Sequence, residues 1–178
     1  MPADADDSPC SISEGQGSLD EFSLIKRFFV RPEIGAGAWP SSSIGDDCAI
    51  LTIGAVKLAV TADMMALGTH FLDDADPYTV GRKALAVNLS DLAAAGASPK
   101  AFFLSIALPE ADPVWLKGFS EGLFEEAERF HCPLRGGDTT KTASVNGLPG
   151  KTCISICAMG EVEGDTYMTR GGAKPGDD

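Results

Sequence analysis

Two Asp-Pro pairs, Asp76-Pro77 and Asp112-Pro113, constrain the fold of this chain more than any other sequence feature. An aspartate accepts hydrogen bonds from the free N–H groups that begin a helix, and proline is favoured in the first helical turn. The segments after the two pairs, YTVGRKALAVNLSDLAAA and VWLKGFSEGLFEEAERFH, are typical of helices, and the first is expected to stop at Gly96. KAFFLSIAL, between them, is typical of a strand. The sequence therefore predicts a helix–strand–helix unit at its centre.

Strands are predicted on both sides of this unit. CAILTI and VKLAVTAD flank Gly54-Ala55 and indicate a hairpin, MMALGTHFLDDAD is expected to be irregular, and TCISICAMGEVEG is expected to be the last strand. CPLRGGDTTK could add a short strand. Near the N-terminus, Ser18 and Glu21 form a capping-box pattern before the helical run EFSLIKRFF, which Arg31-Pro32 would end. We expect an α+β fold in which a mixed sheet of about four strands is covered by helices on one face.

The ends of the chain have a different composition. Residues 1–17 are acidic and rich in small side chains, without the basic start and apolar stretch of a secretion signal, so we expect a disordered tail and a cytoplasmic protein. Residues 18–164 would form the folded domain. Residues 165–178 have turn chemistry and no further element, and we interpret them as the start of a missing C-terminal domain.

Charge and cysteine content exclude several classes of function. The net charge of −12, from 26 acidic and 14 basic residues, argues against a nucleic-acid partner, and no apolar run is long enough to cross a bilayer. The five cysteines are scattered and lack paired zinc-ligand spacing. Cys153 and Cys157 would share one face of the last strand. We interpret the cysteines as reduced thiols that pack as small hydrophobic side chains.

Aspartates recur at the ends of the predicted strands: Asp46 and Asp47 precede one, and Asp63 and Asp138 follow apolar strand-like runs. Asp91 is different because it lies on the apolar stripe of its helix, with Val80, Ala84, Val87 and Ala95. A carboxylate there needs a partner, and Arg82 and Lys83 point to other faces of the helix. Each aspartate alone could be a turn or cap residue. Together they favour a divalent cation bound by oxygen, such as Mg²⁺, Ca²⁺ or Mn²⁺.

Two glycine turns could hold phosphate oxygens. RGGDTT offers backbone amides and hydroxyls, and TRGGAKPG adds Arg170 and Lys174. Neither matches a standard nucleotide motif, and ordinary structural turns remain an alternative. His131, at the end of a predicted helix, would interact with the helix dipole, whereas His70 in GTHF could line a pocket. No residue order indicates a covalent intermediate.

The segments EFSLIKRFF, IGDDCAIL, TADMMALGTHF, KALAVNLSDLAAAGASP, RGGDTT and TRGGAKPGD resemble, in this order, the thiamine-monophosphate kinase family of the aminoimidazole-ribonucleotide synthetase superfamily. The resemblance covers about residues 21–178. It implies a transferase of thiamine biosynthesis that passes the γ-phosphoryl group of ATP directly, in line, to thiamine monophosphate. No catalytic side chain is expected, because metal ions and positioning would carry the reaction. It also implies a homodimer formed through the sheet.

The resemblance assigns roles to individual residues. Magnesium ions would be held by Asp47, Thr61, Asp63, Asp91 and Asp138, with Asp46 the less certain half of its pair. Gly137, Asp138 and Arg170 would contact ATP, and His70 would contact thiamine monophosphate.

Two departures from the family pattern stand out. Ala62 occupies a position where the family commonly has a hydroxyl, and the chain is about half the family's length. We therefore expect little or no turnover from these residues alone. A sister ATP-dependent enzyme of the superfamily and a non-catalytic dimerisation module are the alternative readings.

Overall fold

The computed structural model describes residues 20–30, 44–164 and 167–177. The expected tail at 1–17, Ser18 and the segment after Pro32 lie outside these residues. Helix α1 (Glu21–Phe28) forms a unit of its own. Its N-cap is Asp20, whose Oδ1 accepts the backbone N–H of Ser23 at 3.0 Å, so the predicted cap at Ser18 is wrong. The helix ends before Arg31-Pro32, with Phe29 as its C-cap.

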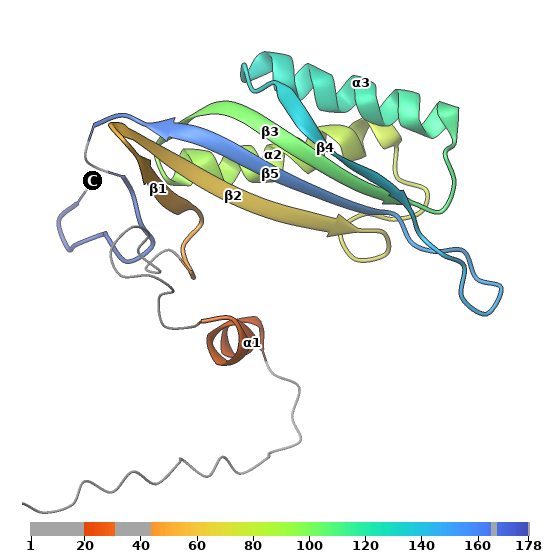
Figure 1. Ribbon diagram of the computed structural model, residues 1–178, viewed down its shortest axis with the longest axis horizontal. Coiled ribbons are helices and arrows are strands. Elements are labelled where there is room, and N and C mark those ends of the chain that lie inside the picture. The colour runs from red at the N-terminus through yellow and green to blue at the C-terminus, as the bar shows by residue number, and fades with distance from the viewer. Residues whose placement is uncertain (1–19, 31–43, 165–166, 178) are drawn as a thin grey trace, which may run out of the picture. The chain divides into compact units, whose positions relative to one another are not determined.

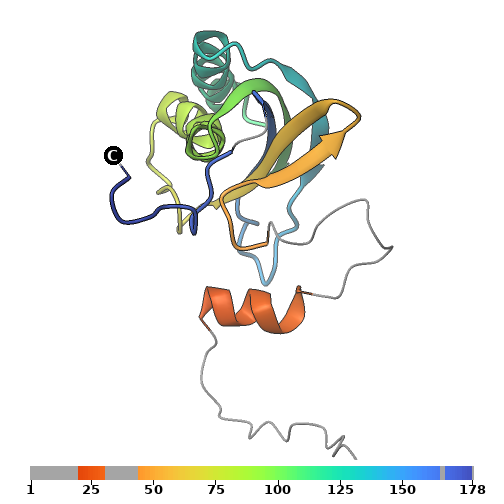
Figure 2. The same ribbon diagram turned by 90° about the vertical axis from the view of Figure 1, so that its left-hand side faces the viewer.

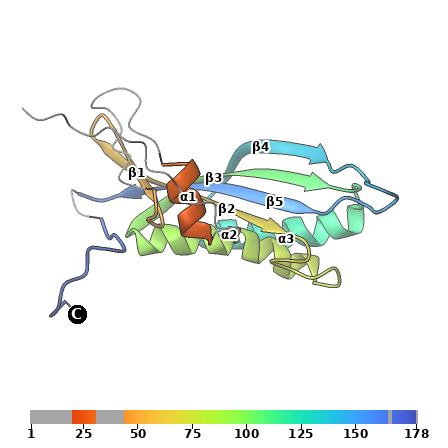
Figure 3. The ribbon, with the colours of Figure 1, turned by 90° about the horizontal axis from the view of Figure 1, so that it is seen from below.

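The main unit is a five-stranded sheet with two helices on one face (Figures 1, 2 and 3). The strands, in the order β1-β2-β5-β3-β4 across the sheet, are β1 (Ala49–Ile53), β2 (Val56–Ala66), β5 (Cys153–Val162), β3 (Ala97–Leu108) and β4 (Leu134–Lys141). Neighbouring strands are antiparallel except β3 and β4, which are parallel. The α+β prediction with a mixed sheet and one helical face is confirmed.

Both Asp-Pro predictions are also confirmed. Helix α2 (Pro77–Ala94) is capped by Asp76, and α3 (Pro113–Arg129) is capped by Asp112, whose side chain accepts the N–H of Val114. The expected hairpin is β1 and β2, joined at Gly54, which has φ +61°. Among the described residues, neither these helices nor α1 combines the length and the apolar character that a bilayer crossing requires.

Strand lengths depart from the sequence predictions. Met64–Ala66, expected to be irregular, continue β2 because they pair with Cys153–Ser155 of β5. Strand β3 begins at Ala97, before the predicted KAFF. The uncertain short strand is β4, a full fifth strand that pairs with β3. In each case the pairing with a neighbouring strand, which local sequence does not encode, supplies the extra length.

The hydrophobic core lies between the sheet and the two helices. Strand β5 shows strict alternation, with every second residue from Ile154 to Val162 buried against the helices. Cys153 and Cys157 lie on its other face, as predicted. We call this other surface, which the helices do not cover, the open face. The described cysteines are free thiols, and Cys48 and Cys132 are buried.

Candidate functional site

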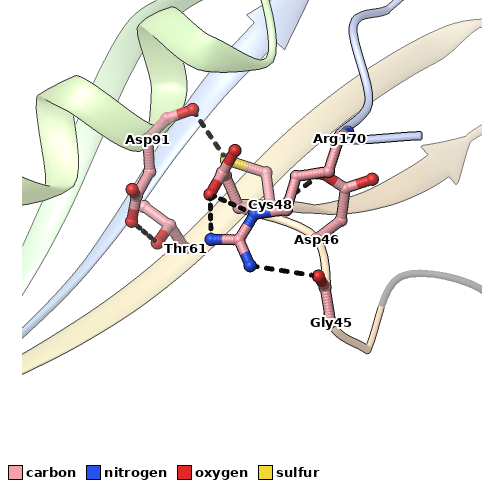
Figure 4. Close-up of polar contacts among 7 residues, drawn as sticks. Gly45, Asp46, Cys48, Thr61, Asp91 and Arg170 are labelled. Atoms are coloured by element: carbon pink, nitrogen blue, oxygen red, sulfur yellow. Dashed lines mark hydrogen bonds and ion pairs between the residues drawn. The ribbon is translucent and has the colours of Figure 1, made fainter. Parts of the chain in front are cut away.

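The best candidate site lies at one end of the sheet, where the loop before β1, the middle of β2, the last turn of α2 and the segment 167–177 meet. Figure 4 shows its polar contacts. Two backbone N–H groups of the segment 167–177 hold it there: Met168 N–H donates to the Ala95 carbonyl and Arg170 N–H donates to the side-chain Oδ1 of Asp46. We call Asp46, Asp47, Thr61, Asp63 and Asp91 the acidic cluster.

Asp91 is the member of the acidic cluster with the least favourable surroundings. Its carboxylate lies in the last turn of α2, where the helix dipole disfavours negative charge. Burial raises the pKa of Asp91, and the neighbouring carboxylates of Asp63 and Asp47 raise it further. The buried hydroxyl of Thr61, which donates to Asp91 Oδ2 at 2.6 Å, and the guanidinium of Arg170 act in the opposite direction. A bound cation would relieve this unfavourable balance.

The prediction that Arg82 and Lys83 do not serve Asp91 agrees with their contacts. Arg82 pairs with Glu126 of α3 at 3.0 Å, and Nζ of Lys83 donates to the carbonyl oxygen of His70 at 2.6 Å. The cation that contacts the acidic cluster among the described residues is instead Arg170, which the resemblance assigns to ATP.

Arg170 forms an ion pair with Asp47. Its Nη2 lies 2.6 Å and its Nε 3.0 Å from Oδ1 of Asp47, while Nη1 donates to the Gly45 carbonyl at 3.3 Å (Figure 4). Asp47 is held from its own loop as well, because its N–H donates to Oδ1 of Asp46 at 2.9 Å. The guanidinium is half exposed and can therefore exchange this carboxylate for another anion.

Cys48 is buried beside the acidic cluster. Its Sγ donates to the main-chain oxygen of Asp91 at 3.3 Å. Burial, together with the charges of Asp91, Asp47 and Asp46, raises the pKa of the Cys48 thiol to about 12. The thiol is therefore protonated at physiological pH and can donate the hydrogen bond to Asp91.

Asn88 is a site residue that sequence reasoning missed. Its side chain is fully buried on α2; Oδ1 accepts the N–H of Asp63 at 3.2 Å, and Nδ2 donates to the Ala84 carbonyl at 3.1 Å. These bonds tie the middle of β2 to the helix that carries Asp91. The signal was present in the sequence, because Asn88 follows Ala84 of the apolar stripe by four residues and is polar.

Asp138 does not join the acidic cluster within this chain. Asp138 pairs with Ser105 of β3. Ser105 in turn pairs with Ser155 of β5, and Ser155 pairs with Met64 of β2. This row lies on the open face, where the same four residues line a shallow pocket of about 160 Å³. Thr61 and Asp91 lie on the helical side.

Gly137 precedes Asp138 and lies against β3. Its φ is +147°, and a Cβ atom there would overlap the backbone of Leu104. The glycine is thus required by the close pairing of β3 and β4, whether or not ATP binds it.

A cleft of about 330 Å³ opens beside the acidic cluster. Asp46, Cys48 and Ile50 line one side, and Tyr167, Met168, Thr169 and Gly171 line the other. His70 is elsewhere, in the loop after β2, exposed and bonded through its ring nitrogen Nδ1 to the N–H of Ala66.

The donor chemistry of the acidic cluster suits Mg²⁺. Carboxylate and hydroxyl oxygens are the ligands that a hard cation prefers. In the described ranges, no three His, Cys, Asp or Glu side chains already stand close enough together to hold an ion. The observation that favours a cation is the raised pKa of Asp91. Burial and the carboxylates of Asp63 and Asp47 raise it by more than Thr61 and Arg170 lower it.

Similarity to known proteins points to one family. The family model described as AIR synthase related protein, N-terminal domain, matches residues 45–162. Thiamine-monophosphate kinase of Escherichia coli (strain K12) is 43% identical over 158 residues, which are 88% of this chain and 46% of the relative. The protein of the same name from Bacillus subtilis (strain 168) is 36% identical over 165 residues, with 89% and 47% covered.

Solved structures agree with these sequence matches. AaThiL complexed with AMPPCP and TMP superposes with a TM-score of 0.67 at 35% identity, over 75% of this chain and 41% of that one. Thiamine-monophosphate kinase from Stenotrophomonas maltophilia K279a gives 0.55 at 42% identity, over 67% and 35%. The chain thus spans about half the length of the curated relatives it matches. Because the family model covers the whole sheet and both of its helices, this chain belongs to the AIR synthase related proteins and carries their N-terminal domain.

Proposed function

We propose that this chain is the Mg²⁺- and ATP-binding half of an enzyme that phosphorylates thiamine monophosphate to thiamine diphosphate. The observation that carries the proposal is the acidic cluster beside Arg170, in a chain 43% identical to a thiamine-monophosphate kinase. AaThiL, the structural neighbour, was solved with AMPPCP and TMP, which supports ATP and thiamine monophosphate as the two substrates.

Asp47, Thr61, Asp63 and Asp91 would hold the magnesium. When bound, Mg²⁺ neutralises phosphate charge and aligns the phosphoryl groups for in-line transfer. The chain's own contribution is positioning. Thr61 fixes the carboxylate of Asp91, and Asn88 fixes the backbone of Asp63. Arg170 would release Oδ1 of Asp47 and bind a phosphate oxygen of ATP, which exchanges one charged hydrogen-bond acceptor for another.

Direct transfer needs no nucleophile from the protein. Cys48, whose buried thiol lies beside the acidic cluster, stays protonated, in keeping with a mechanism that depends on positioning and charge. We expect the residues of this chain alone to turn over slowly if at all, since the relatives are about twice as long.

The test is ligand binding by the chain. Isothermal titration should show AMPPCP binding that requires Mg²⁺, and thiamine monophosphate binding that exceeds binding of a ribonucleotide monophosphate of the same charge. Binding of the ribonucleotide in preference would favour the sister-enzyme reading. Absence of any Mg²⁺-dependent binding or rise in Tm would favour the non-catalytic module.

A homodimer formed through the open face is part of the proposal. Met64 and Phe103 expose apolar surface on that face, and β4 pairs on one side only among the described strands. A second copy would cover this surface and could bring its own acidic cluster toward Asp138, which the single chain leaves apart from Asp91.

The cytoplasmic location and the absence of a nucleic-acid partner stay predictions from the sequence.

Met64→Glu is expected to prevent dimerisation, because it places a carboxylate on the open face close to Asp138. Light scattering after size exclusion should give a dimer for the parent chain and a monomer for this variant. Val114→Glu, on an 80% exposed side chain of α3, is the matched control and should stay dimeric. A monomeric parent chain at tens of micromolar would refute this part of the proposal.

A further inference from the structure

Backbone hydrogen bonds hold the loop after β2 in one conformation. The N–H groups of Thr69 and His70 both donate to the Ala66 carbonyl, at 3.1 and 2.9 Å, and Gly68 N–H donates to the Phe71 carbonyl at 2.8 Å. Leu67 N–H reaches the Thr152 carbonyl at 3.0 Å. Gly68 has φ +82°, a conformation that a residue with a side chain rarely adopts. This turn, residues 66–71, therefore holds His70 in one place.

The hydrogen bond at the imidazole of His70 determines where its proton lies. Nδ1 of His70 accepts the N–H of Ala66 at 3.0 Å, so Nδ1 carries no proton. In the neutral ring the proton must then be on Nε2. His70 is exposed, which leaves Nε2–H free to donate to an anionic oxygen. The neutral His70 ring thus offers a hydrogen-bond donor at Nε2.

Lys83 connects the turn to the helix of the acidic cluster. Its Nζ donates to the His70 carbonyl at 2.6 Å, across 13 residues of chain. Lys83 precedes Asp91 by eight residues of α2, which corresponds to about 12 Å along the helix axis. One helix thus fixes both the turn with its histidine and the carboxylate expected to hold metal.

We infer that Lys83 is a positioning residue that sets Nε2 of His70 at a fixed distance from Asp91, so that a phosphorylated substrate is held at both points. This inference rests on the proposed function. Lys83 acts through the His70 carbonyl, and His70 itself contacts the substrate.

Lys151 provides a matched control. Its Nζ lies 3.3 Å from the place where a Cβ of Gly68 would be, so it adds the same charge to the same turn. Within the described part of the chain, it makes no hydrogen bond or ion pair with the turn. If charge alone mattered, removing either lysine would have the same effect.

The first measurement needs no ligand. Long-range ¹H–¹⁵N spectra report the proton position on each imidazole, and the chain has only two histidines, which His131→Gln distinguishes. The parent chain should show His70 as the Nε2–H tautomer. Lys83→Met should shift the His70 ¹⁵N resonances toward a tautomer mixture, whereas Lys83→Arg and Lys151→Met should retain the parent spectrum. A parent His70 with its proton on Nδ1, or an unchanged spectrum in Lys83→Met, would overturn the inference.

The second measurement is titration with thiamine monophosphate in the presence of Mg²⁺ and AMPPCP. Lys83→Met should weaken thiamine monophosphate binding about 10-fold without changing AMPPCP affinity, with most of the loss restored in Lys83→Arg. Equal losses in Lys83→Met and Lys151→Met would overturn the inference. If the parent chain binds neither ligand, the proposed function fails, and the spectra still decide whether Lys83 positions His70.

Discussion

Asp91→Asn is expected to weaken Mg²⁺-dependent AMPPCP binding by about 100-fold or more, because the loss of an outer-shell partner of a metal ligand alone costs about 10- to 100-fold. The substitution keeps the shape of the side chain and an oxygen that can accept the Thr61 hydroxyl, so the surrounding bonds survive. What it removes is the charge that the cation would neutralise. Titration of parent and variant with AMPPCP at saturating Mg²⁺ measures the difference.

Without metal, the same variant should be at least as stable as the parent chain at pH 7. Burial and neighbouring acids raise the pKa of Asp91 above its value in the unfolded chain, so the folded state disfavours its ionised form. Stability from this group is full below the unfolded pKa and is lost as the pH rises through the folded pKa. Asp91→Asn has no such loss. The difference in Tm between the variant and the parent should therefore increase as the pH rises from the unfolded pKa of Asp91 through its folded pKa.

Asp74→Asn, in the exposed loop before α2, removes an equal charge away from the acidic cluster and should change neither binding nor Tm. Parent-like affinity in Asp91→Asn would mean that Asp91 holds no metal. A large drop in its metal-free Tm would mean that its charge supports the fold instead.

Gly122→Ala is expected to reduce the free energy of unfolding by about 3 kcal/mol, the upper part of the range for overpacking a tight contact. Helices α2 and α3 touch through glycines, since a Cβ on Gly122 would overlap the Tyr78 carbonyl and one on Gly81 would overlap that of Phe119. Alanine in a helix interior normally gains about 1 kcal/mol over glycine. The backbone clash must outweigh this gain, because a carbonyl cannot move aside as a side chain can.

Urea unfolding of Gly122→Ala beside Glu121→Ala measures this effect. Glu121 neighbours Gly122 on α3 but is exposed, so its replacement should change the free energy of unfolding by less than about 0.5 kcal/mol. A Gly122→Ala variant as stable as the parent would show that α2 and α3 can separate slightly without loss.

Helix starts were predictable because they depend on local chemistry. Asp76-Pro77 and Asp112-Pro113 specify caps within three residues of chain, and the structure follows both. Strand limits were less predictable, because partners decide them. Met64–Ala66 extend β2 through pairing with residues about ninety positions away, and β4 exists as a full strand through its pairing with β3.

In the candidate site, too, the features set by local sequence were predictable, and those set by strand pairing were not. The apolar stripe of α2 singled out Asp91, and the structure places Asp47 and Asp63 near enough to influence its pKa. The sequence predicts Asp138 in a glycine turn after an apolar run, which is wrong, because the residue lies inside β4. Local sequence also does not determine which face of the sheet it occupies. Its face depends on the register of β4 against β3, which an irregularity between Phe102 and Phe103 shifts. Asp138 consequently lies on the open face, opposite Asp91.

The contact between Arg170 and Asp47 makes two events mutually dependent. A cation that takes Asp47 must compete with the guanidinium, and the guanidinium helps to hold the segment 167–177 against the sheet. Under the proposed function, a change that loosens this segment would therefore raise the affinity for the cation, and the cation would loosen the segment by the same factor. Binding of the ion at the acidic cluster would thereby change how firmly the segment 167–177, which follows β5, is held against the sheet.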